Sequence, residues 1–263
     1  MLGAIIGDVI GSPYEFGSDK TKEFLLFSPN CRPTDDSIIT IAVGCACVEA
    51  DLYDEDNFKQ ILCEYIREIG LKYPDAGYGG RFYQWMIMNE DTPYEGYTNG
   101  SAMRVSPTAW AVDSLEKVET LAKWSAEITH SHPEGIKGAQ AVAAAIFLAR
   151  TGADKNEIRE YIEEKYYDLN FTTDEIRPSY THDMTCEGSV PQAIVAFLDS
   201  EDFEDAVRNA VSLGGDGDTL ACIAGAIAEA YYGIPDEIQE QVFEYIDEDL
   251  QNYYWSYADE FYR

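Results

Sequence analysis

Two short acidic loops carry the side chains best suited to chemistry in this sequence. They read PTDDS at residues 33–37 and GGDGDT at residues 214–219, and each comes directly before an apolar run that predicts a buried helix. Alone, each loop is ordinary, because a Thr can cap a helix whose positive end favours acids. If the two helix ends meet, four carboxylates share one small space, and their repulsion calls for a cation. Oxygen ligands without His or Cys favour Mg²⁺, Mn²⁺ or Ca²⁺ over zinc, and two divalent ions balance four charges.

Two further segments have residue types that can bind a ligand. Tyr97–Arg104 contains an Asn-Gly pair that predicts a turn entering a helix, and free N–H groups at a helix start can hold a pyrophosphate without a basic side chain. His130 and His132, two of the three histidines, precede the apolar segment 138–150. A single histidine is more often a packed or capping residue than a functional one, so this pair gains weight only beside the acidic loops.

The elements that position these loops are helices. Between Asp54 and Gly70 the apolar residues recur at helical spacing, with Asp54 a candidate N-cap and Gly70 a candidate C′ residue. The same spacing recurs near residue 160 and over 203–211, and Pro235 is placed to open another helix. Segments 138–150 and 220–232 are apolar on all sides and rich in Ala and Gly, which predicts central helices. We find no alternating strand pattern, linker or repeat, so residues 1–263 are predicted to form one all-α domain.

The composition narrows the functional classes. The chain has 263 residues, 46% of them hydrophobic, and a formal net charge of −31, which excludes a DNA-groove reader because such a surface repels phosphates. Six cysteines without a C-x-x-C pair predict buried free thiols. The apolar N-terminus lacks a basic region and is interrupted by Asp8, unlike a signal peptide, and no window is long enough to span a membrane. We expect a cytoplasmic monomer.

Five motifs, in this order along the chain, resemble the ADP-ribosylglycohydrolase family, which includes the dinitrogenase-reductase-activating glycohydrolases. They are GDVIGSPYE (7–15), PTDDS (33–37), TNGSAMRVSP (98–107), THSHPEGIKGA (129–139) and GGDGDT (214–219) followed by LACIAGAIAEAYYG. Each motif is weak alone, and the ordered set is specific. The resemblance implies a single-domain orthogonal helical bundle with a central two-metal site holding two Mg²⁺ or Mn²⁺ ions. It also implies hydrolysis of the glycosidic bond between ADP-ribose and a modified acceptor.

The resemblance also implies roles for individual residues. The implied metal ligands are Thr34, Asp35, Asp36, Asp216, Asp218 and Thr219. The implied substrate-binding residues are Tyr97, Asn99, Gly100, Ser101, Met103 and, rather than His132, His130. Glu15 matches a glutamate on a mobile loop, here Gly11 to Ser18, near the scissile bond. The general base is either Asp216 or Glu15, and both remain candidates.

The identity of the acceptor stays open at this point. We expect an ADP-ribosylated protein or a small ADP-ribose conjugate as partner, with arginine slightly preferred as the modified side chain. O-linked ADP-ribose on serine, in poly(ADP-ribose) or in O-acetyl-ADP-ribose is the alternative. Two-metal phosphoester hydrolysis, a non-catalytic binding or structural role, and a signalling or immunity role are further hypotheses. Segment 168–187 contains no recognised motif and is interpreted as a substrate-facing insertion.

Overall fold

The computed structural model describes residues 1–17, 20–88 and 92–262. Within these residues the chain is a set of helices joined by loops, and its β structure is limited to isolated bridges, which confirms the all-α prediction. The α-helices are α1 (Leu2–Gly11), α2 (Asp35–Glu49), α3 (Glu55–Gly70), α4 (Gly80–Met88), α5 (Leu115–Glu127), α6 (Pro133–Arg150), α7 (Lys155–Lys165), α8 (Thr173–Ile176), α9 (Cys186–Leu198), α10 (Phe203–Val211), α11 (Gly217–Tyr232), α12 (Asp236–Val242) and α13 (Glu248–Phe261). Three short 3-10 helices are η1 (Ser12–Tyr14), η2 (Asn99–Ser101) and η3 (Ser106–Ala109).

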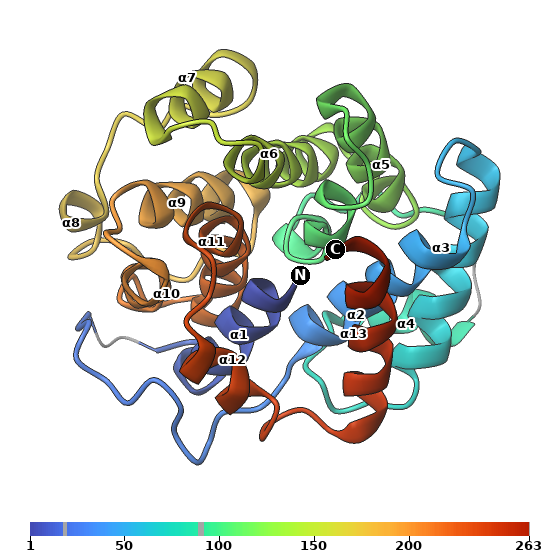
Figure 1. The fold of residues 1–263 in the computed structure, drawn as a ribbon, viewed down its shortest axis with the longest axis horizontal. Coiled ribbons are helices and arrows are strands. Elements are labelled where there is room, and N and C mark those ends of the chain that lie inside the picture. The colour runs from blue at the N-terminus through green and yellow to red at the C-terminus, as the bar shows by residue number, and fades with distance from the viewer. Residues whose placement is uncertain (18–19, 89–91, 263) are drawn as a thin grey trace.

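Helix α11 lies in the core, in contact with α1, α6, α9 and α10 (Figure 1). Its residues from Gly217 to Glu229 are all buried, as expected for a helix that is apolar on every side. The central position predicted for the two Ala- and Gly-rich segments is therefore confirmed, although both helices begin earlier than predicted. Helix α6 starts at Pro133 instead of residue 138, and α11 starts at Gly217 instead of residue 220.

Helix α1 packs antiparallel to α11 at nearly backbone contact. All ten residues of α1 are buried. A Cβ atom built on Gly7 would lie 2.0 Å from the Ala221 carbonyl oxygen, and one built on Gly11 would lie 2.5 Å from the Cα of Asp218. Glycine is required at such close approaches because any side chain would separate the helices. The pairing places Asp8, on the same helix, beside the N-terminal end of α11.

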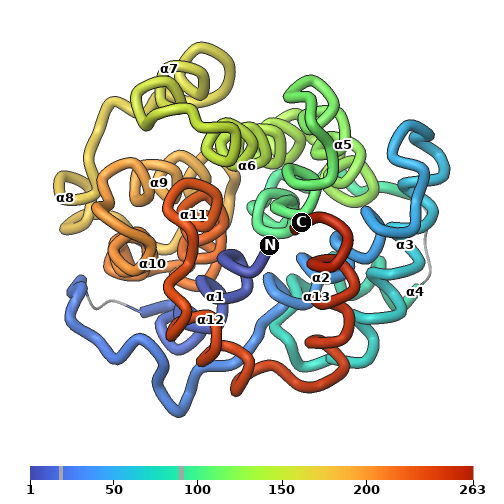
Figure 2. The backbone as a smooth tube through the Cα atoms, viewed as in Figure 1, coloured from blue at the N-terminus to red at the C-terminus, as the bar shows by residue number. Residues whose placement is uncertain are grey.

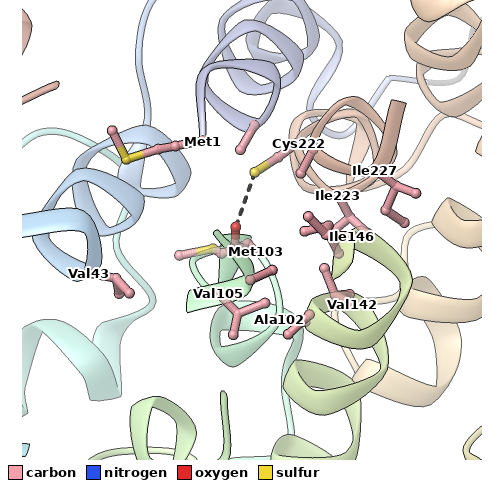
Figure 3. Close-up of a cluster of buried hydrophobic side chains, with 14 of the residues drawn as sticks. Met1, Val43, Ala102, Met103, Val105, Val142, Ile146, Cys222, Ile223 and Ile227 are labelled. Carbon is pink, nitrogen blue, oxygen red and sulfur yellow. Dashed lines mark hydrogen bonds between the residues drawn. The ribbon is translucent and has the colours of Figure 1, made fainter. Parts of the chain in front are cut away.

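Helix α2 is the second helix that carries an acidic loop, and it packs against α1, α3 and α13 (Figure 1). The Thr34 side chain caps its first turn by accepting a hydrogen bond from the Asp36 N–H, as the sequence predicts. The Thr40 hydroxyl of α2 and the Cys222 thiol of α11 both donate to the Met103 carbonyl oxygen at 3.3 Å. Figure 3 shows the Cys222 side chain pointing toward Met103 amid the surrounding apolar side chains. The segment after η2 is thus fixed between the two acid-bearing helices.

An irregular segment, residues 20–34, leads into α2 and runs along the lower left edge of the molecule in Figure 2. The Arg208 guanidinium of α10 holds it by donating to the carbonyl oxygens of Lys22 and Phe24 at 2.8 and 2.9 Å. The segment lacks regular structure, so its path depends on side-chain donors from neighbouring helices.

Several local predictions differ from the structure. Gly70 is the last residue of α3 and is buried, so it is not the C′ residue; the chain leaves the helix at Leu71. Pro235 is the N-cap of α12 rather than its first residue. The Asn-Gly turn opens only the three-residue helix η2, not an α-helix. All six cysteines are free thiols, and no helix in the described part of the chain is long and apolar enough to cross a membrane.

Candidate active site

Three buried carboxylates from three helices meet at the bottom of the site. Asp8 of α1, Asp36 of α2 and Asp218 of α11 each offer one oxygen, and these oxygens lie within 4.8 Å of one another. Asp8 accepts hydrogen bonds from the backbone N–H groups of Thr34 at 2.8 Å and Ser37 at 3.0 Å, and from both of their hydroxyls. It therefore binds α1 to the first turn of α2. The sequence analysis assigned Asp8 no role in the site.

Asp36 has an oxygen that invites a cation. Its Oδ2 accepts hydrogen bonds from the Thr219 hydroxyl at 3.3 Å and from the Thr34 hydroxyl at 3.4 Å. Its Oδ1 is buried and has no hydrogen-bond partner within the described residues. A buried carboxylate oxygen without a donor, beside two other buried carboxylates, is unfavourable unless a positive charge compensates it. The donor set consists of hard oxygen atoms and fits a divalent ion such as Mg²⁺ or Mn²⁺.

The electrostatics of the cluster point the same way. Burial raises the pKa of Asp8, Asp36 and Asp218, and neighbouring carboxylates raise the pKa of Asp36 and Asp218 further. Burial, followed by the charges of Asp8 and Asp216, raises the pKa of Asp35 to about 8. The protein alone thus disfavours full ionisation of the cluster near neutral pH, whereas bound cations would favour it.

A cleft of about 410 Å³ opens above the acidic cluster. It brings together most residues singled out from the sequence: Glu15, Asp35, Asp36, Tyr97, Asn99, Gly100, Met103, His130, Asp216, Asp218 and Thr219. Further lining residues that the sequence analysis did not select are Phe16, Gly77, Gly79, Gly80, Arg81, Phe82, Tyr94, Glu95, Gly96, Thr98 and Met184.

Two of the selected residues lie outside the lining of the cleft. Thr34 is buried below it, where its hydroxyl donates to Asp8 at 2.6 Å. Ser101 is fully buried, and its hydroxyl donates to the Gly135 carbonyl oxygen at 2.7 Å. The Ser101 side chain therefore fixes η2 to the first turn of α6 and has no free contact with the cleft.

Glu15 reaches the cleft from the loop that follows η1. The loop is bound to the second acidic loop, because the Phe16 N–H donates to the Gly215 carbonyl oxygen at 2.7 Å. The Glu15 side chain is half-buried, and burial together with the Asp216 carboxylate raises its pKa. The two candidate bases are thus close enough to influence each other. Ser18, the last residue of the predicted mobile loop, lies outside the described residues.

Asn99 connects the substrate-side segment to the second acidic loop. Its side-chain amide donates to Asp216 Oδ2 at 2.6 Å, and its backbone N–H donates to the Met184 carbonyl oxygen at 2.8 Å. The Cys186 N–H donates to the Tyr97 carbonyl oxygen at 3.0 Å. Segment 168–187 therefore reaches the cleft through Met184, which forms part of its rim.

The two histidines have different surroundings. His130 is buried and contacts the Thr98 hydroxyl with Nε2 at 2.9 Å and the Thr129 hydroxyl with Nδ1 at 2.8 Å. Burial, and then the nearby charge of Arg104, hold the pKa of His130 well below its usual range. His132 caps α6 by accepting the Glu134 N–H at 3.1 Å. Of the two, it is His130 that lines the cleft, in agreement with the choice made from the sequence.

Comparisons with known proteins bear on this site. The profile of the family described as ADP-ribosylglycohydrolase matches residues 1–263. The chain is 26% identical to the human ADP-ribosylhydrolase ARH3, an alignment that covers 95% of this chain and 90% of the human protein. It is also 26% identical to the ADP-ribosylarginine hydrolase Tri1 of Pseudomonas putida (strain GB-1), over 92% of this chain and 72% of that protein. A solved structure described as an ADP-ribosylglycohydrolase-related protein complex superposes with a TM-score of 0.69 at 22% identity, over 98% of this chain and 96% of that one.

Proposed function

The chain belongs to the ADP-ribosylglycohydrolase family, and from this membership and its cleft we propose that it hydrolyses the glycosidic bond between ADP-ribose and a modified acceptor. The observation that carries the proposal is the convergence of both acidic loops, Glu15 and the segment 97–103 on one cleft. The volume of about 410 Å³ lies within the usual range of small-molecule sites.

We assign the cation-binding role to the acids at the bottom of the cleft. The proposed ligands are Thr34, Asp35, Asp36, Asp216, Asp218 and Thr219, supplemented by Asp8. The Oδ2 atom of Asp8 already accepts three hydrogen bonds, so Oδ1 is the atom that retains capacity for an ion. Divalent ions, once bound, would neutralise the acids, orient the ribose diol and acidify a water molecule.

The protein's own side chains divide the remaining work. Asp216 is held by the Asn99 amide, whereas the Glu15 carboxylate accepts no hydrogen bond from the described residues. Glu15 is therefore the better placed of the two to accept a proton from an attacking water, with its raised pKa closer to neutrality. The bond to the acceptor then breaks through an oxocarbenium-like state, as in other glycoside hydrolyses. Asn99 keeps Asp216 oriented, and neutral His130 supports the substrate-side wall.

The acceptor that we propose is an arginine side chain. A guanidinium leaving group is cationic, and the carboxylates of Glu15 and Glu95 line the cleft that must accommodate it. One relative of similar identity is named an ADP-ribosylarginine hydrolase. The same charges offer no comparable attraction to a neutral serine hydroxyl.

Incubation with defined conjugates tests the proposal. ADP-ribosyl-arginine, ADP-ribosyl-serine and poly(ADP-ribose) should be supplied separately, each with Mg²⁺ or Mn²⁺. We expect release of free ADP-ribose, with the arginine conjugate cleaved fastest. Faster cleavage of the serine conjugate or of the polymer would refute the acceptor assignment. Lack of cleavage of all three would refute hydrolysis itself.

A further inference from the structure

A buried cation without a carboxylate partner lies behind the cleft. The Arg104 side chain is 0% exposed and forms no ion pair within the described residues. Its Nη2 donates to the Ser125 carbonyl oxygen at 2.5 Å and to the Thr129 hydroxyl at 2.9 Å, while Nε and Nη1 lack partners there. An uncompensated buried charge is costly. Its position therefore calls for a role beyond packing.

The direction of the hydrogen bonds from Arg104 can be worked out from its chemistry. A guanidinium only donates, so the Thr129 oxygen must accept from it. The Thr129 proton is then available to His130 Nδ1, which lies 2.8 Å away. A neutral His130 that accepts at Nδ1 carries its proton on Nε2, and Nε2 lies 2.9 Å from the Thr98 oxygen. Burial and the Arg104 charge keep His130 neutral by lowering its pKa.

The last group in this chain faces the ligand. Thr98 lines the cleft and is half-buried. Because its oxygen accepts from His130, its own proton remains free for an acceptor in the cleft. Of the oxygens in ADP-ribose, the charged phosphoryl oxygens are the strongest acceptors. We propose that Arg104, acting through Thr129 and His130, fixes the Thr98 hydroxyl as a hydrogen-bond donor to a phosphoryl oxygen of bound ADP-ribose. This inference rests on the proposed function for the identity of the ligand.

Arg104 and Thr129 are positioning residues in this scheme, and Thr98 is the residue that contacts the ligand. The opposite arrangement has a structural basis too, because the Thr129 hydroxyl also interacts with the Tyr94 phenol. If Tyr94 takes the Thr129 proton, His130 must carry its proton on Nδ1. Thr98 would then donate to His130 and have no proton for the cleft. The two arrangements therefore require opposite tautomers of His130.

Nuclear magnetic resonance distinguishes the tautomers directly. The chain has three histidines, so a full-length sample labelled with ¹⁵N-histidine gives few signals, and a His130→Gln sample identifies the one from His130. We expect a neutral ring at pH 7 with the proton on Nε2. A ring protonated on Nδ1 overturns the proposal.

Binding measurements test the consequence for the ligand. Thr98→Val removes the donor while retaining the shape, and calorimetry should show ADP-ribose binding weakened about tenfold, as expected for one lost hydrogen bond to a charged group. Adenosine, which lacks phosphates, should bind Thr98→Val and wild type equally. Unchanged ADP-ribose affinity, or an equal loss for both ligands, overturns the proposal.

A matched pair of variants separates positioning from packing. Thr129→Val removes the hydroxyl that links Arg104 to His130, so the His130 proton should no longer be confined to Nε2 and ADP-ribose should bind several-fold more weakly. Ser125→Ala also removes a buried hydroxyl beside Arg104, but that hydroxyl has no hydrogen-bond partner, and Arg104 contacts only the Ser125 carbonyl. It should leave both readouts unchanged. Equal effects of the two variants would mean that Thr129 acts only through packing, which overturns the relay.

Failure of the relay and failure of the proposed function are distinguishable. Neither the tautomer of His130 nor the affinity for ADP-ribose depends on turnover. A protein that shows the expected tautomer and the tenfold loss in Thr98→Val, but cleaves no conjugate, supports the relay and contradicts hydrolysis. A protein that cleaves conjugates while Thr98→Val binds ADP-ribose normally contradicts the relay alone.

Discussion

Replacing Asp8 with alanine tests how the first helix is joined to the site. The change removes the acceptor for the buried N–H groups of Thr34 and Ser37, which lie 2.8 and 3.0 Å from Asp8 Oδ2. Each backbone donor left buried without an acceptor costs about 1–3 kcal/mol, so two of them cost about 2–6 kcal/mol. That is a large part of the stability of a typical domain. Asp8→Ala should therefore lower the free energy of unfolding markedly.

Charge works against this loss when no divalent ion is bound. Asp8 lies within 4.8 Å of carboxylate oxygens of Asp36 and Asp218, and removing one of three buried acids relieves their repulsion. Asp8→Asn separates the two effects, since its amide oxygen can still accept at the Oδ2 position while the charge is lost. We expect Asp8→Asn to be at least as stable as wild type in EDTA, and Asp8→Ala to be clearly less stable.

Urea unfolding in EDTA and in saturating Mg²⁺ measures both terms. Magnesium should stabilise the wild type, because only the folded chain has the site, and should stabilise Asp8→Asn less. Wild-type stability of Asp8→Ala in EDTA would show that its hydrogen bonds do not secure α1 to α2. A wild-type response of Asp8→Asn to Mg²⁺ would show that Asp8 contributes nothing to the electrostatics of the ion site.

Three further substitutions probe the cleft. Glu15→Gln keeps the shape of the side chain but cannot accept a proton, so kcat should fall about 10²–10⁴-fold; ADP-ribose affinity measured by calorimetry should change less than about threefold, and near-wild-type turnover would leave Asp216 as the base. Asp36→Asn and Asp218→Asn should each abolish turnover while the chain still folds, and thermal melts should show a smaller gain from Mg²⁺ than in wild type; equal gains would contradict the ion site. Gly100→Val should weaken ADP-ribose binding and leave the Mg²⁺-induced thermal shift intact, because a Cβ there would lie 3.2 Å from His130 Nε2; unchanged affinity would place the ligand elsewhere.

The helices and the acidic loops could be predicted from the sequence because both are local patterns. Helical spacing and the two Ala- and Gly-rich segments predict an all-α chain with α6 and α11 in its interior, and each acidic loop is recognisable beside the helix that it opens. That the two loops share one cleft followed from charge reasoning and is seen in the structure.

Asp8 was missed for a physical reason. An acid within an apolar segment looks like an interruption of that segment when only neighbours in sequence are considered. Its donors, Thr34 and Ser37, are 26 and 29 residues away, and only the close packing of α1 on α11 brings it to them. A single acid in an otherwise buried helix was the available signal.

Thr98 and Ser101 show the same limit within a recognised motif. The motif indicates a substrate-side segment but not which side chains face the ligand. The Ser101 hydroxyl is committed to Gly135 of α6, and the Thr98 hydroxyl faces the cleft because His130 holds it from behind. These orientations depend on tertiary contacts made by residues 34 and 32 positions away.

Product analysis tests the central claim most directly. Wild-type protein and Asp36→Asn are incubated with ADP-ribosyl-arginine in Mg²⁺ and in EDTA, and free ADP-ribose and inorganic phosphate are measured together. The account predicts that wild type in Mg²⁺ releases ADP-ribose without phosphate, and that EDTA or Asp36→Asn abolishes the release. Release of phosphate in place of ADP-ribose, or equal ADP-ribose release in EDTA and by Asp36→Asn, would contradict a cation-dependent glycosidic hydrolysis at this site.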